Sequence, residues 1–211
     1  MKKLAIIGSK DLAQQMAHHV KADNKFQVVG FFDDFEIKGT RKYGIPVLGK
    51  IDEIQNFFEA KTFDELIIGI GYKYLSFREE LFQRFSDTIP FASFVHSSTF
   101  LDSSSRLGKG SFIYPGCNID MYTTIGDNVL MYNDCVLAHN SILGSHSVLS
   151  PSVKIAGFVE VGKRVNFGIG TVIIDNLKVA DDVRTGASAT IVSDIDKPGL
   201  YFGCPAKFIK E

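Results

Sequence analysis

The chain has 211 residues, of which 45% are hydrophobic and 22% charged, a composition that can bury a core and that excludes disordered, collagen-like and disulfide-scaffold chains. Lysine and arginine number 23 against 24 acidic residues, so the net charge of −1 gives no field that favours nucleic acid. No apolar run approaches the roughly 18 residues of a membrane span, and the apolar start ends at Gly8, too early for a signal peptide. Three cysteines without C-x-x-C spacing suit a reducing compartment. We therefore expect a cytoplasmic protein without membrane insertion and without a nucleic-acid partner.

The first ninety residues alternate predicted strands and helices. We expect strands over residues 4–8, 26–32 and 66–71, and helices over residues 11–20, 51–60 and 74–85. This alternation is typical of a small parallel sheet flanked by helices, which binds ligands at the carboxyl ends of its strands.

Two groups of residues follow such strand ends. Gly8, Ser9 and Lys10 come after the first strand, and Asp33 and Asp34 come after the second. A phosphate near the first turn, with a ribose or base held by an acidic side chain, would make this a nucleotide-type site. The alternative is that Gly8 only turns the chain and that the two aspartates belong to a solvated loop.

A period of six residues runs through the rest of the chain. Steps of six from Val95 to Ile191 give 17 positions, of which 16 are large and apolar, with Thr185 the exception. The fifth residue of each hexad is small or β-branched in nearly every case. This period fits neither a helix nor a flat strand. It predicts a triangular solenoid in which three hexads make one 18-residue coil, with apolar residues inward and small residues at the corners.

The repeat resembles the hexapeptide-repeat family, whose fold is a left-handed parallel β-helix. The resemblance covers Val95 to Ile195 without a phase break. The fold class we expect is a small Rossmann-like α/β domain over residues 1–90, followed by a left-handed β-helix with a short tail over residues 91–211. Cys117 and Cys135 are 18 residues apart, so they should fill the same inward corner of successive coils rather than form a disulfide.

The whole chain is similar to the sialic acid O-acetyltransferase family, which includes bacterial N-acetyltransferases of nucleotide-linked 4-amino sugars of the bacillosamine and perosamine pathways. The similarity rests on the Phe-Phe-Asp-Asp segment 31–34, the segment 44–49 and the Gly-Cys-Pro-Ala-Lys segment 203–207. It implies a nucleotide-linked amino sugar on the N-terminal domain, and acetyl-CoA along the solenoid between the subunits of a homotrimer. The family's first turn usually reads Gly-Ala-Gly-Gly-His, where this chain has two fewer glycines and where Lys10 could supply a charge.

His139 stands at the outward third position of its hexad. Positions 18 residues apart form columns, which bring around it Met121, Tyr122, Asn140, Gly157 and Phe158. Outward apolar side chains around one histidine suggest a buried contact between subunits. The alternative is an ordinary surface histidine.

The family resemblance also implies roles for residues of the solenoid. The segment 136–140 matches the place where the family has its catalytic histidine followed by an acid. The resemblance therefore implies that His139 is the general base and that Asn140 is its partner. It also implies that Gly157 contacts the acetyl oxygen, and that Ile169 and the backbone of Ala187 contact acetyl-CoA. An amide such as that of Asn140 can orient an imidazole but stabilises imidazolium less than a carboxylate does.

Together these residues predict an acetyl-CoA-dependent N-acetyltransferase that acts on the amine of a nucleotide-linked amino-deoxy sugar. O-acetylation of a sialic acid or a related sugar is the neighbouring alternative, and the nucleotide can be UDP, dTDP or GDP. A non-catalytic trimeric binding protein stays open, because Val148 stands where many members have a second histidine. A zinc hydratase needs three histidine ligands, and only His139 and His146 lie within the coils, so we expect no metal.

Overall fold

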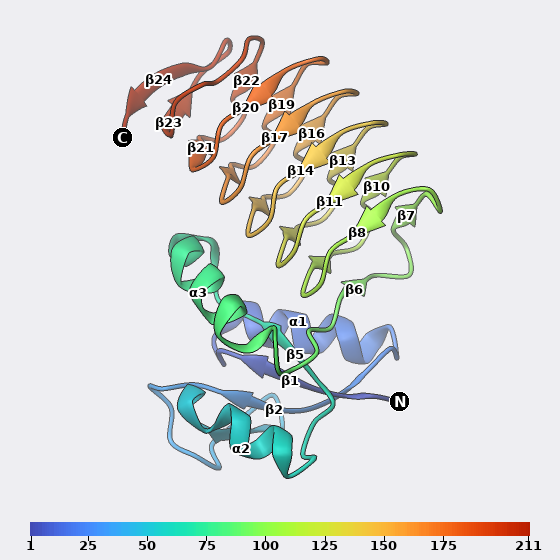
Figure 1. Ribbon diagram of the computed structural model, residues 1–211, viewed down its shortest axis with the longest axis vertical. Helices are drawn as coiled ribbons and strands as arrows, with labels where there is room; N and C mark the ends of the chain where they lie inside the picture. The colour runs from blue at the N-terminus through green and yellow to red at the C-terminus, as the bar shows by residue number, and fades with distance from the viewer. The chain divides into compact units, whose positions relative to one another are not determined.

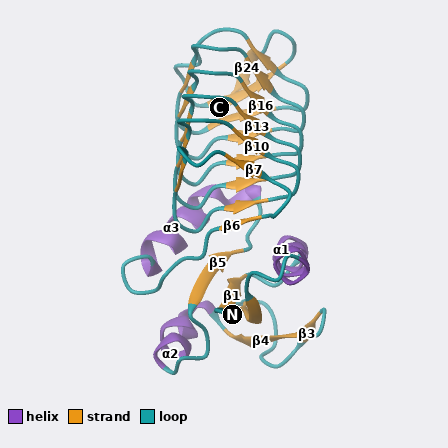
Figure 2. Ribbon diagram, turned by 90° about the vertical axis from the view of Figure 1, so that its right-hand side faces the viewer, coloured by secondary structure: helices purple, strands orange, loops and turns teal.

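Residues 1–211 are described by a computed structural model, in which the chain forms two compact units, Met1–Phe94 and Val95–Glu211 (Figure 1). Figure 2 shows the first unit as a sheet with helices and the second as a stack of coils. No helix has the length and apolar character that crossing a membrane requires.

The N-terminal unit is a five-stranded sheet in the order β3-β4-β2-β1-β5. Its strands are β1 (Lys3–Ile7), β2 (Gln27–Phe32), β3 (Arg41–Lys42), β4 (Ile45–Gly49) and β5 (Glu65–Ile68). Its helices are α1 (Asp11–Ala22), α2 (Ile54–Glu59) and α3 (Leu75–Phe85), with short 3-10 turns η1 (Ile51–Glu53) and η2 (Tyr72–Tyr74). All pairings are parallel except that of β3 with β4. The predicted small α/β domain is confirmed, whereas the β3–β4 hairpin was not predicted.

Apolar patterning explains these elements. Residues Leu4 to Ile7 are all fully buried, as expected for a parallel strand covered on both faces. Helix α1 buries Ala13, Met16, Ala17 and Val20, whose spacing of three and four residues forms one helical face.

The C-terminal unit is a stack of coils, and the short strands of successive coils form three sheets. One sheet contains β7 (Phe100–Leu101), β10 (Asn118–Ile119), β13 (Val136–Leu137), β16 (Lys154–Ile155), β19 (Val172–Ile173) and β22 (Thr190–Ile191). The second contains β8 (Arg106–Leu107), β11 (Thr124–Ile125), β14 (Ile142–Leu143), β17 (Glu160–Val161) and β20 (Lys178–Val179). The third contains β6 (Phe94–Val95), β9 (Phe112–Ile113), β12 (Leu130–Met131), β15 (Val148–Leu149), β18 (Asn166–Phe167), β21 (Val183–Thr185), β23 (Gly199–Phe202) and β24 (Lys207–Lys210).

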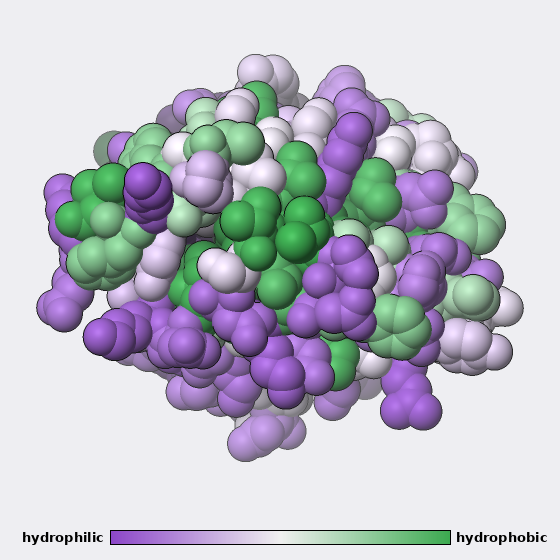
Figure 3. Space-filling view, turned by 90° about the horizontal axis from the view of Figure 1, so that it is seen from above, coloured by the Kyte–Doolittle hydropathy of each residue, from purple (hydrophilic) through white to green (hydrophobic).

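The chain ends in a hairpin on the last coil. Strand β23 pairs in parallel with β21 and antiparallel with β24. A Cβ at Gly186 would lie 1.8 Å from Cε1 of Phe202, so the absence of a side chain there lets the ring pack on the last coil. Seen from above, this face shows apolar side chains near its centre (Figure 3), and the hairpin exposes Phe202, Phe208 and Ile209.

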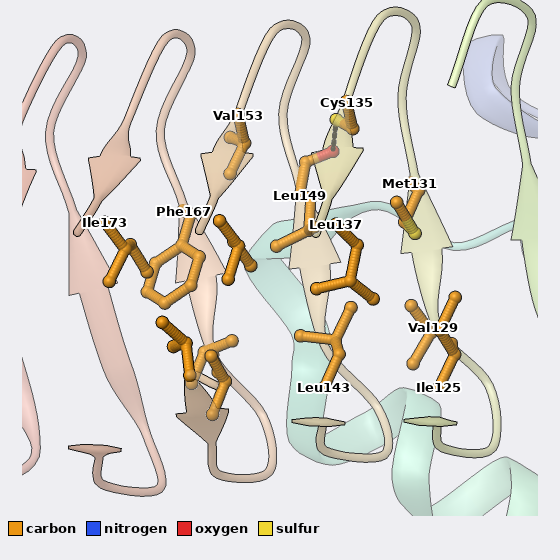
Figure 4. Packing of buried hydrophobic residues seen from close by; sticks show 14 of the residues in the cluster. Ile125, Val129, Met131, Cys135, Leu137, Leu143, Leu149, Val153, Phe167 and Ile173 are labelled. Atoms are coloured by element: carbon orange, nitrogen blue, oxygen red, sulfur yellow. Dashed lines mark hydrogen bonds between the residues drawn. The ribbon is translucent and has the colours of Figure 1, made fainter. Parts of the chain in front are cut away.

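Each strand from β7 to β19 pairs with the strand 18 residues later, whereas Val183 of β21 pairs with Gly199 of β23, 16 residues later. Ile119 of β10 lies beside Leu137 of β13, which in turn lies beside Ile155 of β16. The predicted period of six is therefore confirmed, and its apolar positions form one continuous core (Figure 4). The exception, Thr185, is also buried, and its hydroxyl bonds to the Thr171 hydroxyl at 2.7 Å. The left-handed sense of the coil stays a prediction.

The corners of the coils require a left-handed backbone. Every sixth residue from Gly110 to Ser188 has a φ between 53° and 75°. Glycine, asparagine and aspartate adopt this conformation most easily, and they occupy most of these corners. The larger residues at such corners are Tyr122, His146, Phe158 and Arg164.

Small polar side chains hold the inner side of the corners. The Cys117 thiol donates to the carbonyl of Tyr132 at 3.1 Å, and the Cys135 thiol donates to that of Ser150 at 3.2 Å. Both cysteines are buried and free, so the predicted space-filling role without a disulfide is confirmed.

We expect Phe167→Ala to lower the free energy of unfolding by about 3–5 kcal/mol, because Phe167 is fully buried and its loss leaves a cavity. Ile142→Ala removes a side chain that is 46% exposed, so its effect should stay within about 0.5 kcal/mol. Urea unfolding followed by circular dichroism measures both. Equal losses for the two variants would contradict the assignment of the core.

Candidate functional site

His139 lies at the outer corner that follows β13. Its Nδ1 is 3.2 Å from Oδ1 of Asn140, and its ring meets that of Phe158 edge-on, with 5.2 Å between the centroids. An amide oxygen can only accept a hydrogen bond, so Nδ1 carries the proton in this arrangement. The lone pair of Nε2 is then available to a substrate.

Gly157 allows the imidazole to lie over the backbone of the next coil. A Cβ at this position would be 2.7 Å from Cε1 and 2.9 Å from Nε2 of His139. Any other residue would therefore displace the ring. The N–H of Gly157 donates to no group of the chain, which leaves it available to an oxygen of a ligand.

Two aromatic residues flank Asn140 in its column. Tyr122 and Phe158 have φ values of 58° and 59°, a conformation that costs bulky residues on the order of 1–3 kcal/mol. Their side chains are 62% and 53% exposed, so burial within the chain does not offset this cost. Phe158 contacts the His139 ring within the chain, and a contact of both aromatic side chains with another subunit stays a prediction.

The predicted contacts to acetyl-CoA lie at another corner of the solenoid. Ser188 donates its N–H to the carbonyl of Ile169 at 2.8 Å, so Ile169 and Ala187 lie on neighbouring coils. Both are exposed. Their corner follows the sheet that contains β18, whereas His139 follows the sheet that contains β13. Within one chain, the structure brings Ile169 and Ala187 together but does not bring them to His139.

Asp33 and Asp34 connect the loops at the carboxyl edge of the N-terminal sheet. The Asp33 carboxylate is nearly buried and accepts the N–H and hydroxyl of Ser9, at 3.0 and 2.7 Å, and the N–H of Phe35 at 2.9 Å. Asp34 accepts the N–H of Ile51 at 2.9 Å. These carboxylates therefore shape the loops, and their contact with a ligand stays a prediction.

The turn after β1 needs glycine at its first position. Gly8 has a φ of +90°, and a Cβ there would lie 3.1 Å from the carbonyl oxygen of Gly69. Lys10 immediately precedes α1, whose first N–H groups are a suitable environment for an anion.

An exposed aromatic residue at the same edge was not predicted. Phe35 is 89% exposed, and Nζ of Lys10 lies 5.8 Å from its ring centroid. Its position directly after the two aspartates was the only signal for it in the sequence.

The remaining histidines have other surroundings. His18 and His19 are neighbours on α1, His96 bonds to the Ser98 hydroxyl at 2.9 Å, and buried His146 lies 3.1 Å from the amide of Asn128. The structure contains no group of three or more histidine, cysteine or acidic side chains placed to hold a metal ion.

Comparison with known proteins gives matches to both parts of the chain. Residues 3–85 match the model of the PglD N-terminal domain. The structure is similar to that of a perosamine N-acetyltransferase from Caulobacter crescentus, with a TM-score of 0.92 and 26% identity over 100% of this chain and 98% of the other. The acetyltransferase domain of PglB from Neisseria gonorrhoeae FA1090 has the same fold, with a TM-score of 0.90 and 22% identity over 99% of this chain and 100% of the other.

Curated relatives match a shorter part. A UDP-3-O-acylglucosamine N-acyltransferase from Bordetella pertussis is 35% identical over 81 residues, which are 38% of this chain and 22% of that protein. The chain thus spans about a fifth of the length of this relative. The first part of the chain thus matches the PglD N-terminal domain, and the whole chain has the fold of these two acetyltransferases; none of these matches carries the sialic acid O-acetyltransferase name.

We expect Asp33→Ala to lower the free energy of unfolding of the N-terminal unit by about 2–3 kcal/mol, since three hydrogen bonds to a buried carboxylate are lost. Asp34→Ala loses one such bond and should cost about 1 kcal/mol. Denaturant unfolding of both variants measures the difference. A larger loss for Asp34→Ala would contradict this description of the loops.

Proposed function

We propose that this protein is an acetyl-CoA-dependent N-acetyltransferase that acts on the amine of a nucleotide-linked amino sugar. The observation that carries the proposal is the imidazole of His139 held over Gly157, beside an N–H that has no acceptor within the chain. The chain also matches the Caulobacter perosamine N-acetyltransferase over nearly the full length of both. Structures of that enzyme contain CoA and GDP-perosamine, and two of them are variants in which one histidine is replaced.

The two groups would act on different atoms of the reaction. Nε2 of His139 takes a proton from the sugar amine as the amine nitrogen attacks the thioester carbonyl. The N–H of Gly157 donates to the oxyanion of the tetrahedral intermediate. Collapse of the intermediate forms the amide, breaks the carbon–sulfur bond and releases CoA, whose sulfur receives a proton. Asn140 holds the imidazole through Nδ1.

The N-terminal unit would bind the nucleotide sugar. Lys10 and the first N–H groups of α1 suit a diphosphate, which carries negative charge. Gly8 and Ser9 shape the turn that would approach it, with Asp33 and Asp34 fixing the loop on its other side. We therefore assign sugar binding to residues 1–90 and acyl transfer to residues 91–211.

The proposed site requires a second copy of the chain. The contacts to acetyl-CoA at Ile169 and Ala187 belong to one corner of the solenoid, and His139 belongs to another. In a homotrimer, a corner of one left-handed β-helix can face a different corner of its neighbour, so acetyl-CoA would lie between subunits. The exposed aromatic side chains of Tyr122 and Phe158 would lie in this interface.

We expect His139→Ala to lower kcat at least about 100-fold, since a positioned general base contributes about that much or more. Release of free thiol from acetyl-CoA, measured with amino-sugar nucleotides, tests this. His18→Ala is the control, because His18 lies on α1 outside the proposed machinery.

The same assay separates the alternatives. Thiol release with hydroxyl-sugar acceptors alone would favour O-acetylation. No release with any acceptor would favour a non-catalytic binding protein. This alternative is tested because Asn140 replaces the acidic partner that the family usually has. Full activity of His139→Ala would refute the proposed mechanism.

We expect Asn140→Asp to raise kcat several-fold. A carboxylate at this position stabilises the imidazolium that forms when His139 takes the proton, as an amide does not. The measurement is kcat at saturating acetyl-CoA and acceptor, with Asn176→Asp as a control at the corner two coils further along. A fall in kcat for Asn140→Asp with unchanged folding would contradict the proposed role of residue 140.

A further inference from the structure

Ser141 lies on the inner side of the corner that carries His139 and is fully buried. Its hydroxyl donates to the carbonyl of Ala156 at 2.8 Å, lies 3.5 Å from the carbonyl oxygen of His139, and accepts the N–H of Val159 at 3.2 Å. Neither the Ala156 carbonyl nor the Val159 N–H has another partner in the chain. One hydroxyl therefore holds both ends of the turn that contains Gly157.

This hydrogen bond fixes the direction of the Gly157 N–H. The carbonyl of Ala156 and the N–H of Gly157 belong to one planar trans peptide, so they point in opposite directions. Because the carbonyl is bonded to a buried hydroxyl, the N–H points outward, away from the interior of the coil. The His139 ring lies over Gly157 on this outer side.

We propose that Ser141 is a positioning residue for the acyl transfer, because its hydroxyl aims the Gly157 N–H at the oxyanion. The inference rests on the proposed function and adds to it a residue that never touches the substrate. Without the hydroxyl, the Ala156–Gly157 peptide loses its one fixed contact and can rotate, so the N–H is no longer preorganised.

The repeat itself does not require a hydroxyl at this position. The fifth hexad position holds buried valine at residues 129, 153, 159, 165 and 183. Apolar residues therefore fit these corners, and Ser141 variants should fold.

The chain offers a matched control at another corner. Ser111 is equally buried, and its hydroxyl donates to the carbonyl of Gly126 at 3.0 Å and accepts the N–H of Val129 at 3.1 Å. Ser111→Ala loses the same two bonds as Ser141→Ala, but at a corner without His139.

The test compares kcat and KM for acetyl-CoA in Ser141→Ala, Ser141→Val, Ser141→Thr and Ser111→Ala. We expect both Ser141→Ala and Ser141→Val to lower kcat about tenfold with KM changed less than about twofold, because the lost contact acts in the transition state. Ser141→Thr keeps the hydroxyl and should retain most of kcat, since Thr99 at the same hexad position donates to the carbonyl of Tyr114 at 2.8 Å. Ser111→Ala should keep the wild-type kcat.

A measurement without substrate separates this inference from the proposed function. In protein labelled with ¹⁵N-glycine, the amide signal of Gly157 should shift in Ser141→Ala and stay in place in Ser111→Ala. An inactive wild type refutes the proposed function. An unchanged chemical shift of the Gly157 amide in Ser141→Ala refutes the claim that the Ser141 hydroxyl orients the Ala156–Gly157 peptide. Equal losses of kcat in Ser141→Ala and Ser111→Ala overturn the positioning role.

Discussion

The C-terminal unit depends on one constraint, the constant register of 18 residues between coils. The N–H of Val136 bonds to the carbonyl of Val153, and the N–H of Lys154 bonds to that of Thr171, at 2.9 Å in both cases. One inserted residue would shift every later coil and turn inward side chains outward. From β7 to β22 this register does not change, so residues 18 apart in these coils are neighbours. A site can therefore be assembled from single residues on successive coils.

The same register explains why chemistry can lie at the corners. Side chains within the strands either fill the core or cover flat faces, whereas a corner directs its third and fourth residues outward. The left-handed backbone there favours small polar residues, so a large one is costly. Tyr122 and Phe158, which lie one coil before and one coil after Asn140, both have this left-handed backbone. Their exposure makes the corner of His139 differ from corners occupied by glycine, asparagine or aspartate.

Periodicity in the sequence predicted the parts of the structure that repeat. The 18-residue columns placed Gly157 next to His139, and the structure confirms this contact. Periodicity could not predict the partners of individual hydrogen bonds. The carboxylate of Asp33 bonds to Ser9, 24 residues away in the sequence, in a loop without periodic pattern, and its contact with a ligand stays a prediction. The β3–β4 hairpin was missed because β3 has only two residues, too few to show an alternation.

The surroundings of His139 also bear on the choice between an amine and a hydroxyl acceptor. Asn140 orients the ring but brings no charge, and the next acidic residue in the column, Asp175, is two coils away, about 10 Å at the spacing of neighbouring strands. Across such a distance in water, a carboxylate stabilises an imidazolium by only about 0.4 kcal/mol. Within the two columns of His139 and Asn140, therefore, no neighbouring coil supplies a carboxylate to a protonated His139. A hydroxyl must lose its proton almost entirely to become a good nucleophile, whereas a neutral amine attacks first and then releases an acidic proton. An amine acceptor therefore needs less help from a charged partner of His139 than a hydroxyl does, which fits the N-acetylation proposed above.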